Sequence, residues 1–407
     1  MFRLPLLILG GVQNQTKKPM KYFFILGNNP AISLAELTAV LGVAVQLLPK
    51  TSVAMIEQTE AIDAERFISR LGGTIKIGRF FAETKIETSA MLAAVKPQAH
   101  PATGKFKFGF SYYGPGRLNL KPLGMELKKF LSQNGTSCRW VISREPTLSS
   151  VVVEQNGLLK NGAEFVLVRA GNKILVGQTL AVQPFKELEV RDYGRPARDD
   201  LSGMLPPKLA QILINLARVK PDDKLLDPFC GSGTVLTEAA LMGYKNLFGS
   251  DNSAKAIGDT EKNVKWILQN FQFSIFNFQL NKIDATKISE SFEPDSVDAI
   301  VTEPYLGPQR GKADTRVVVK ELEELYAASL AEFHKILKPG GKIVMIWPVF
   351  NTPAGRIMLS QKIIGKLRII SPLSSVYQAT TGTTGRQTLL YGREGQKVWR
   401  EIVILEK

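Results

Sequence analysis

Leu225-Leu-Asp-Pro-Phe-Cys-Gly-Ser-Gly-Thr234 is the stretch that predicts the fold of this chain. Its apolar start is typical of a buried strand, and the apolar positions that follow it predict a helix. Glycines between a strand and a helix let the backbone approach a ligand closely, while the free amides at the helix start favour an anionic group. The stretch therefore predicts an α/β domain with a ligand-binding turn.

Two later strand ends also carry acids. A predicted strand over residues 246–249 leads to Asp251, and another ends at Asp284. An acid in the place of Asp251 can accept hydrogen bonds from both hydroxyls of a ribose. With Asp227 at the first strand end, the three acids suit S-adenosylmethionine: Asp227 near its ammonium group, Asp251 on its ribose and Asp284 on its adenine. The alternative is that these acids cap the helices that follow them.

A nicotinamide dinucleotide fits the same turn less well. Its fingerprint Gly-x-Gly-x-x-Gly has a third glycine, which the shorter turn of this chain lacks. We therefore expect S-adenosylmethionine as the cofactor. The residues expected to bind it are Asp227, Phe229, Gly231, Gly233, Thr234, Asp251, Asn252, Asp284 and Ala285.

A fourth predicted strand, 297–302, leads into Glu303-Pro304-Tyr305. An exocyclic amine of a nucleobase is a poor nucleophile because its lone pair is delocalised into the ring, and acceptors that bind its hydrogens make it more reactive. The Glu303 carboxylate and the Pro304 carbonyl are expected to be these acceptors, with an aromatic side chain stacked on the displaced base. Glu303, Pro304 and Tyr305 are therefore the expected catalytic residues.

The chain resembles the S-adenosylmethionine-dependent tRNA guanine N2-methyltransferases, which join an N-terminal ferredoxin-like region and a THUMP RNA-binding domain to a Rossmann-like methyltransferase domain. The resemblance runs from Met20 to the C-terminus and is carried by residues 195–207, 227–234 and 391–398. It implies methylation of the N2 amine of a guanosine in tRNA, at position 10, in the cytoplasm. Some members of this family need a small activator protein, so a partner subunit of that kind stays open.

The catalytic turn departs from the pattern of these enzymes. Amino methyltransferases of this kind carry D-P-P-Y or N-P-P-Y there, whereas this chain has Glu303 in the first place and one proline before Tyr305. In an ungapped match, Tyr305 takes the place of the second proline and Leu306 that of the aromatic residue. Glutamate is one methylene longer than aspartate and reaches the amine if the loop shifts. The alternative is that Glu303 caps a loop in a protein without activity.

The charge of the chain predicts a polyanionic partner. The 407 residues carry a formal net charge of +15, with more of the surplus in residues 1–190 than in the rest. A charge of this size attracts nucleic acid. Aromatic residues at 106, 108 and 110 lie among the basic ones, and their period-two spacing also fits the buried side of a strand. The residues expected to bind RNA are Lys105, Lys107, Arg117, Lys128, Arg139 and, in a polar segment suited to a mobile lid, Arg310.

Shifts in composition divide the chain. We expect a flexible extension at 1–19, a ferredoxin-like region at 20–95, a THUMP domain at 96–184, a linker at 185–204 and a Rossmann-like methyltransferase domain at 205–407. The fold class is α/β, with a seven-stranded, mostly parallel sheet in the last domain and α+β units before it. Ser33, with Glu36 at capping-box spacing, predicts the start of the first helix.

Other classes of site and function receive less support. Cys138 and Cys230 are the only cysteines, too few for a disulfide framework or a zinc site, so we expect a reducing compartment and no metal. No apolar run near the start approaches the roughly 20 residues of a membrane helix, so neither a membrane span nor a signal peptide is expected. Two other functions stay open: amino methylation of another RNA or DNA base, and RNA binding by a vestigial, non-catalytic methyltransferase fold.

Overall fold

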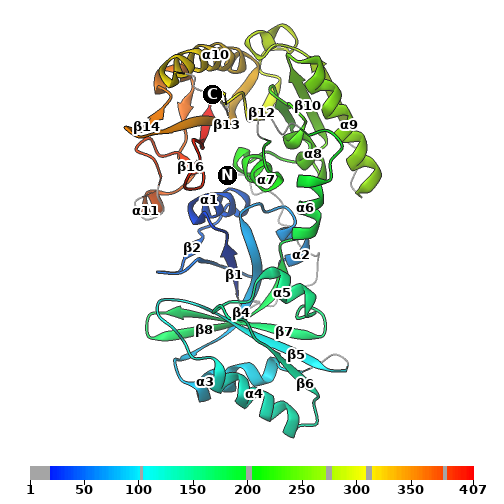
Figure 1. Ribbon diagram of the computed structural model, residues 1–407, viewed down its shortest axis with the longest axis vertical. Coiled ribbons are helices and arrows are strands. Elements are labelled where there is room, and N and C mark those ends of the chain that lie inside the picture. Colours follow the sequence, from blue (N-terminus) through cyan, green and yellow to red (C-terminus); the bar gives the residue numbers. More distant parts are fainter. Residues whose placement is uncertain (1–18, 101–103, 199–203, 272–276, 309–313, 379–382) are drawn as a thin grey trace. The chain divides into compact units, whose positions relative to one another are not determined.

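The computed structural model describes residues 19–100, 104–198, 204–271, 277–308, 314–378 and 383–407 (Figure 1). The expected extension at 1–19 lies outside these residues, Pro19 excepted. The chain divides into two compact units, the first made of residues 1–30 and 41–185 and the second of residues 31–40 and 186–407. No helix in the described ranges is long and apolar enough to cross a membrane.

The first unit is built on an eight-stranded sheet with the strand order β2-β3-β1-β4-β8-β7-β5-β6. The strands are β1 (Met20–Leu26), β2 (Gln46–Leu47), β3 (Val53–Gln58), β4 (Thr74–Lys85), β5 (Phe106–Tyr113), β6 (Cys138–Val141), β7 (Gly162–Ala170) and β8 (Lys173–Val182). β4 pairs with β8. Strands from both expected N-terminal domains, 20–95 and 96–184, therefore lie in one sheet.

Helices cover this sheet because its apolar side chains gather on defined faces. The helical elements of the first unit are α2 (Ala64–Ile68), α3 (Thr88–Val95), η1 (Lys96–Gln98), α4 (Lys121–Gln133) and α5 (Ser150–Gln155). Phe106, Phe108 and Phe110 of β5 are buried against Met91 of α3 and Leu127 of α4. The period-two aromatic residues of β5 are thus core residues.

The first helix starts earlier than its capping-box spacing predicts. α1 spans Pro30–Leu41, so Ser33 lies inside the helix, buried, and is not its N-cap. Proline suits the first helical position because its φ is already helical and its missing N–H needs no partner there. Residues 31–40 belong to the second unit, where Asn215 Nδ2 donates a hydrogen bond to Glu36 Oε1 at 2.8 Å.

The second unit contains a nine-stranded sheet with the main path β11-β10-β9-β12-β13-β17-β15, while β14 and β16 pair off this path. The strands are β9 (Lys224–Asp227), β10 (Asn246–Asp251), β11 (Asn277–Lys282), β12 (Val297–Thr302), β13 (Leu337–Thr352), β14 (Gly355–Met358), β15 (Arg368–Ile369), β16 (Leu389–Tyr391) and β17 (Val398–Glu406). Neighbours from β11 to β13 are parallel, and β17 is antiparallel to β13. The path confirms the expected seven-stranded α/β sheet, with two short strands added.

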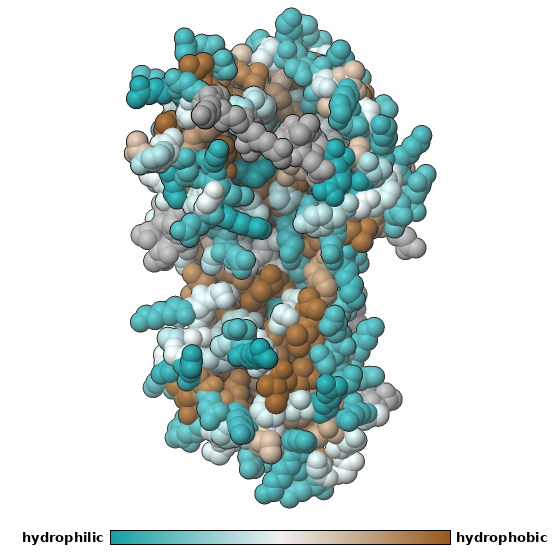
Figure 2. All heavy atoms as spheres, in the orientation of Figure 1, coloured by the Kyte–Doolittle hydropathy of each residue, from teal (hydrophilic) through white to brown (hydrophobic). Residues whose placement is uncertain are grey.

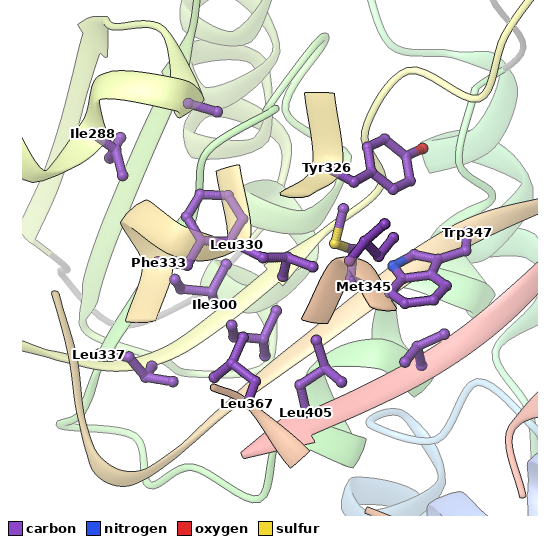
Figure 3. Packing of buried hydrophobic residues seen from close by; sticks show 14 of the residues in the cluster. Ile288, Ile300, Tyr326, Leu330, Phe333, Leu337, Met345, Trp347, Leu367 and Leu405 are labelled. Carbon is purple, nitrogen blue, oxygen red and sulfur yellow. The ribbon is translucent and has the colours of Figure 1, made fainter. Parts of the chain in front are cut away.

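Helices cover both faces of this sheet. The helical elements are α6 (Phe185–Tyr193), α7 (Pro207–Ala217), α8 (Thr234–Leu241), α9 (Ala254–Asn270), η2 (Ala285–Glu290), α10 (Thr315–Ile336), η3 (Gln361–Ile364) and α11 (Ser375–Gln378). Tyr326, Leu330 and Phe333 of α10 are in one buried cluster with Ile300 and Trp347 (Figure 3). No buried residue of α7 belongs to that cluster, although α7 contacts β12 and β13, so α7 packs on the opposite face.

Candidate active site

The turn after β9 depends on two glycines with left-handed backbone conformations. Gly231 has φ 54° and Gly233 has φ 80°. A Cβ on Gly233 would lie 2.7 Å from Thr260 Cγ2, so this position has no room for a side chain. Gly233 is also the N-cap of α8. Its contribution to the site is therefore the shape of the turn that leads into the helix.

Asp251 at the end of β10 fixes this turn. Its Oδ2 accepts a hydrogen bond from Gly231 N at 3.1 Å, and its Oδ1 accepts one from Ser253 N at 2.9 Å. Each carboxylate oxygen has a second lone pair. Asp251 can therefore hold the turn and still accept hydrogen bonds from a ligand.

Asp227 at the end of β9 is almost fully buried. Its Oδ1 accepts hydrogen bonds from Thr302 Oγ1 at 2.6 Å and from Phe229 N at 3.2 Å. Burial, and to a smaller extent the nearby Asp251 and Glu303, raises the pKa of Asp227 to about 7, against the lowering effect of the two hydrogen bonds. The site therefore contains a carboxyl group that changes charge near neutral pH and favours a cation beside it.

Asp284 combines the two roles that the sequence left open. Its Oδ1 accepts hydrogen bonds from Thr286 N at 2.9 Å and from Thr286 Oγ1 at 2.8 Å, which makes it the N-cap of η2. It also lines the same cavity as Asp227 and Asp251. Capping uses one oxygen and leaves lone pairs that can accept from a ligand.

A cavity of about 590 Å³ lies at the carboxyl ends of the central strands, a volume that suits a small-molecule ligand. It forms there because β11, β10, β9 and β12 are parallel neighbours, so their ends meet at one edge of the sheet. All the expected cofactor-binding residues except Gly233 line this cavity, and so do Glu303, Pro304 and Tyr305. The structure thus brings the two expected halves of the site together.

The Glu303 side chain is held by an arginine. Arg400 Nε contacts Glu303 Oε1 at 2.5 Å and Arg400 Nη2 contacts Oε2 at 3.4 Å. The two side chains are 16% and 11% exposed. Glu303 is thus a partly buried carboxylate at the cavity, with a fixed cationic partner.

The rest of the catalytic turn is fixed through its backbone. Tyr326 of α10 donates a hydrogen bond from its hydroxyl to Tyr305 O at 2.7 Å. Leu306 is buried, and Gly307 has φ 91° with Val318 too close to admit a Cβ. The Tyr305 side chain is 55% exposed and borders the cavity. An aromatic ring is therefore available one residue earlier than in D-P-P-Y.

Arg400 and Tyr326 are site residues that the sequence did not reveal. Both lie far along the chain from the turn, on β17 and α10. No local spacing connects them to Glu303 or Tyr305. The closing segment 391–398 was a usable signal for Arg400, because it leads directly into β17.

Cys230 lies in the turn after β9 and lines the cavity. Cys230 is buried, and burial together with the nearby Asp227 raises the pKa of its thiol, so a reactive thiolate is disfavoured. Within the described residues, no group of three or more His, Cys, Asp or Glu side chains is arranged to hold a metal ion.

The expected RNA-binding residues divide between two faces of the first unit. Lys107 and Arg139 are neighbours in register on β5 and β6. They lie opposite the face that α4 covers, since the residues flanking each of them pack toward α4. Lys128 lies on α4 itself. Lys105 and Arg117 are exposed, and Arg310 lies outside the described residues.

Hydrophilic side chains cover much of the face shown in Figure 2, with apolar areas between them. On this face both units present mainly hydrophilic side chains to the solvent. Lys107 and Arg139 are the two expected contacts that the structure places directly side by side.

Comparisons with known proteins agree with this geometry. Residues 195–361 match UPF0020, the RMKL-like methyltransferase domain. A tRNA (guanine(10)-N2)-dimethyltransferase of Methanothermobacter thermautotrophicus is 31% identical over 209 residues, which are 50% of this chain and 57% of that protein. A tRNA (guanine(6)-N2)-methyltransferase of Thermus thermophilus is 29% identical over 183 residues, 43% of this chain and 47% of that protein. The matched region spans about half the length of these curated relatives.

The fold is shared over a greater length than the sequence. The crystal structure of TrmN from Thermus thermophilus superposes with a TM-score of 0.52 at 17% identity, covering 96% of this chain and all of that one. At this identity the likeness concerns the fold, and it includes the N-terminal unit as well as the methyltransferase domain. Residues 195–361 of this chain are therefore similar to the RMKL-like methyltransferase domain, and the chain is similar in sequence to tRNA guanine N2-methyltransferases.

Proposed function

We propose that this chain transfers a methyl group from S-adenosylmethionine to the exocyclic N2 amine of a guanosine in tRNA, at position 10. The observation that carries the proposal is the single cavity lined by the strand-end acids and by the Glu303–Tyr305 turn. A cofactor held by the acids would lie beside an amine held by the turn. The relatives named for N2 methylation of guanine 10 or guanine 6 support guanine as the target base.

The cavity fits a cationic nucleoside. S-adenosylmethionine supplies an electrophilic methyl group when bound, and it carries an ammonium group, a ribose diol and an adenine. Asp227 would attract the ammonium group, because a cation stabilises the ionised form of a carboxyl whose pKa is about 7. Asp251 would accept from the ribose hydroxyls and Asp284 from the adenine amino group. Phe229 and Ala285 would offer apolar surface to the base.

The catalytic turn would orient and polarise the target amine. The Glu303 carboxylate and the Pro304 carbonyl accept hydrogen bonds from the two amine hydrogens and increase the electron density on nitrogen. Tyr305, with its exposed ring at the cavity, stacks on the displaced guanine. Holding the amine in line with the methyl group supplies the remaining acceleration.

The first unit would bind the tRNA. We assign residues 20–95 to a ferredoxin-like region and residues 96–184 to a THUMP RNA-binding domain, followed by a linker and the methyltransferase domain from residue 205. Lys107 and Arg139 form a basic pair on the face opposite α3 and α4, beside the part of that face where Val141 packs with Val153 of α5, and the exposed Arg139 suits contact with a phosphate. Lys105 and Arg117 are exposed and would extend this contact.

The function is tested with the full chain, labelled S-adenosylmethionine and unmodified tRNA. The product nucleoside is identified by mass after digestion, and a transcript with adenosine at position 10 is the control. We expect N2-methylguanosine in the first transcript and none in the control. Methylated adenine in RNA or DNA, or no cofactor binding by calorimetry, would overturn the proposal. Activity of the chain alone would exclude the need for an activator subunit.

A further inference from the structure

We propose that Arg400 is a positioning residue that holds the Glu303 carboxylate where it receives the target amine. The inference rests on the proposed function, because it assigns Arg400 a role through Glu303. The two residues are 97 positions apart in the chain, yet two nitrogens of Arg400 contact both oxygens of Glu303. Arg400 itself does not line the cavity. Its effect on an amine therefore passes through the glutamate.

The topology of the sheet explains why an arginine is needed. β13 lies between β12, after which Glu303 follows, and β17, which carries Arg400. Arg400 is in register with Pro348 of β13 and with Tyr391 of β16. Cross-strand partners project from the same face, so the Arg400 side chain must extend past Pro348 to reach Glu303. Only a long side chain with several donors spans this distance and still makes a two-point contact.

The Glu303–Arg400 pair lies at a cavity that is rich in acidic side chains. Asp227, Asp251, Asp259, Asp284 and Glu303 all line one cavity, and Lys255 lies among them. Burial lowers the pKa of Arg400, but the Glu303 carboxylate outweighs this effect and raises the pKa overall, so the guanidinium stays charged. Arg400 thereby places a positive charge beside one of these acids, at the carboxylate of the catalytic turn.

The pair also compensates for the departure from D-P-P-Y. Glutamate has one more rotatable bond than aspartate and loses more side-chain freedom when it is fixed. Arg400 fixes both oxygens in advance. A carboxylate has about four lone-pair sites, and Arg400 occupies two of them, so acceptors remain for the amine. The contacts with Arg400 thus restrict the position of the Glu303 carboxylate, as the shorter side chain of an aspartate would do.

A second ion pair on the same strand supplies a matched control. Arg386 contacts both oxygens of Glu401, which follows Arg400 on β17 and is fully buried. Successive residues of a strand face opposite sides, and neither Arg386 nor Glu401 lines the cavity. Weakening this pair should disturb β17 without touching the catalytic turn.

The test measures kcat for tRNA methylation, the Kd for S-adenosylmethionine and Tm in the full chain. The variants are Arg400→Lys, Arg400→Ala, Glu303→Gln, the double variant Glu303→Gln/Arg400→Ala, and the control Arg386→Lys. We expect kcat to fall about tenfold in Arg400→Lys and about a hundredfold in Arg400→Ala, because small misplacements of a catalytic group have effects of this size. The Kd should stay within about twofold of wild type, since binding of the cofactor relies on the strand-end acids.

The double variant separates positioning from an independent effect. Once Glu303 is replaced by glutamine, removal of Arg400 should lower kcat by less than about threefold, because residues that act as a unit are not additive. Arg386→Lys should lower Tm and leave kcat unchanged.

Three results would overturn the inference: wild-type kcat in both Arg400 variants, a parallel loss of kcat and cofactor affinity, or additive effects in the double variant. If Arg400→Ala does not fold, Arg400→Lys carries the same test. If the wild-type chain is active and one of these results is found, only the proposed role of Arg400 is rejected. If the wild-type chain makes no N2-methylguanosine, the proposed function is rejected.

Discussion

Two carboxylates, one in each unit, are paired with a basic side chain at 2.5 Å: Glu164 with Lys76 and Glu303 with Arg400. Glu164 is fully buried inside the eight-stranded sheet, where Lys76, Ser111 and Thr179 all donate to it. Glu303 borders the cavity, and Arg400 is its only hydrogen-bond donor in the described part of the chain. An ion pair of this kind therefore stabilises the fold where three donors surround the carboxylate, and it can serve a ligand where the carboxylate keeps acceptor sites at a cavity.

The largest effect is expected from Glu164→Ala. The variant leaves Lys76 buried without its partner, and breaking a buried pair costs about 3–5 kcal/mol of stability. Urea unfolding of the full chain measures this loss. Glu83→Ala is the matched control, because Glu83 pairs with Lys173 on the surface and its removal should change the stability little. Equal losses in both variants would contradict the structural role of Glu164.

Glu303→Ala should act on chemistry instead of stability. Removing one preorganised polar group at a reacting centre typically lowers kcat by about 10²–10³-fold. Steady-state methylation of tRNA measures kcat, and calorimetry measures the Kd for S-adenosylmethionine, which should change little. Wild-type turnover in this variant would show that Glu303 is not the amine acceptor.

Asp251→Ala should instead reduce the affinity for the cofactor and retain the affinity for tRNA. A hydrogen bond to a charged group contributes about 1.5–3 kcal/mol, which corresponds to a Kd roughly 10- to 100-fold weaker. The loss of the bond to Gly231 N loosens the turn as well. Calorimetry with S-adenosylmethionine measures the change in cofactor affinity. An unchanged Kd would show that Asp251 does not bind the cofactor.

Asp227 predicts a pH dependence of cofactor binding. Its pKa in the folded chain is about 7, so the carboxyl is mostly protonated below that pH. A cationic ligand favours the ionised form, and binding at low pH must therefore release a proton. Affinity should rise with pH up to about 7 and then level off, with a Kd about tenfold weaker at pH 6 than at pH 8. Asp227→Asn should remove this dependence, and a pH-dependent Kd in that variant would assign it to another group.

The smallest effects are expected on the RNA face. Lys107→Ala and Arg139→Ala should each weaken tRNA binding and reduce the slope of log K against log salt by about 0.7–0.9, because each would neutralise one phosphate. Lys128→Ala tests the opposite face on α4. If the slope is unchanged in the Lys107 and Arg139 variants but reduced in the Lys128 variant, the RNA binds on the face that α4 covers.

Local signals predicted much of the second unit. The strand 297–302 was placed at both ends correctly, and Asp251 and Asp284 fall where the expected strands end, because apolar runs and acids at their ends are short-range features. Helix starts were less certain. α1 begins at Pro30, ahead of the Ser33 that capping-box spacing indicated, because proline also suits the first helical position.

The sequence by itself determined the glycine-shaped turn, the acids at the strand ends and the Glu-Pro-Tyr turn, because each depends on neighbours within a few residues. Tertiary structure alone decided that strands of both N-terminal regions share one sheet, that Lys76 meets Glu164, and that Arg400 reaches Glu303. These contacts join residues from strands that are distant in the chain. Their positions follow from strand order and packing, which no local pattern encodes.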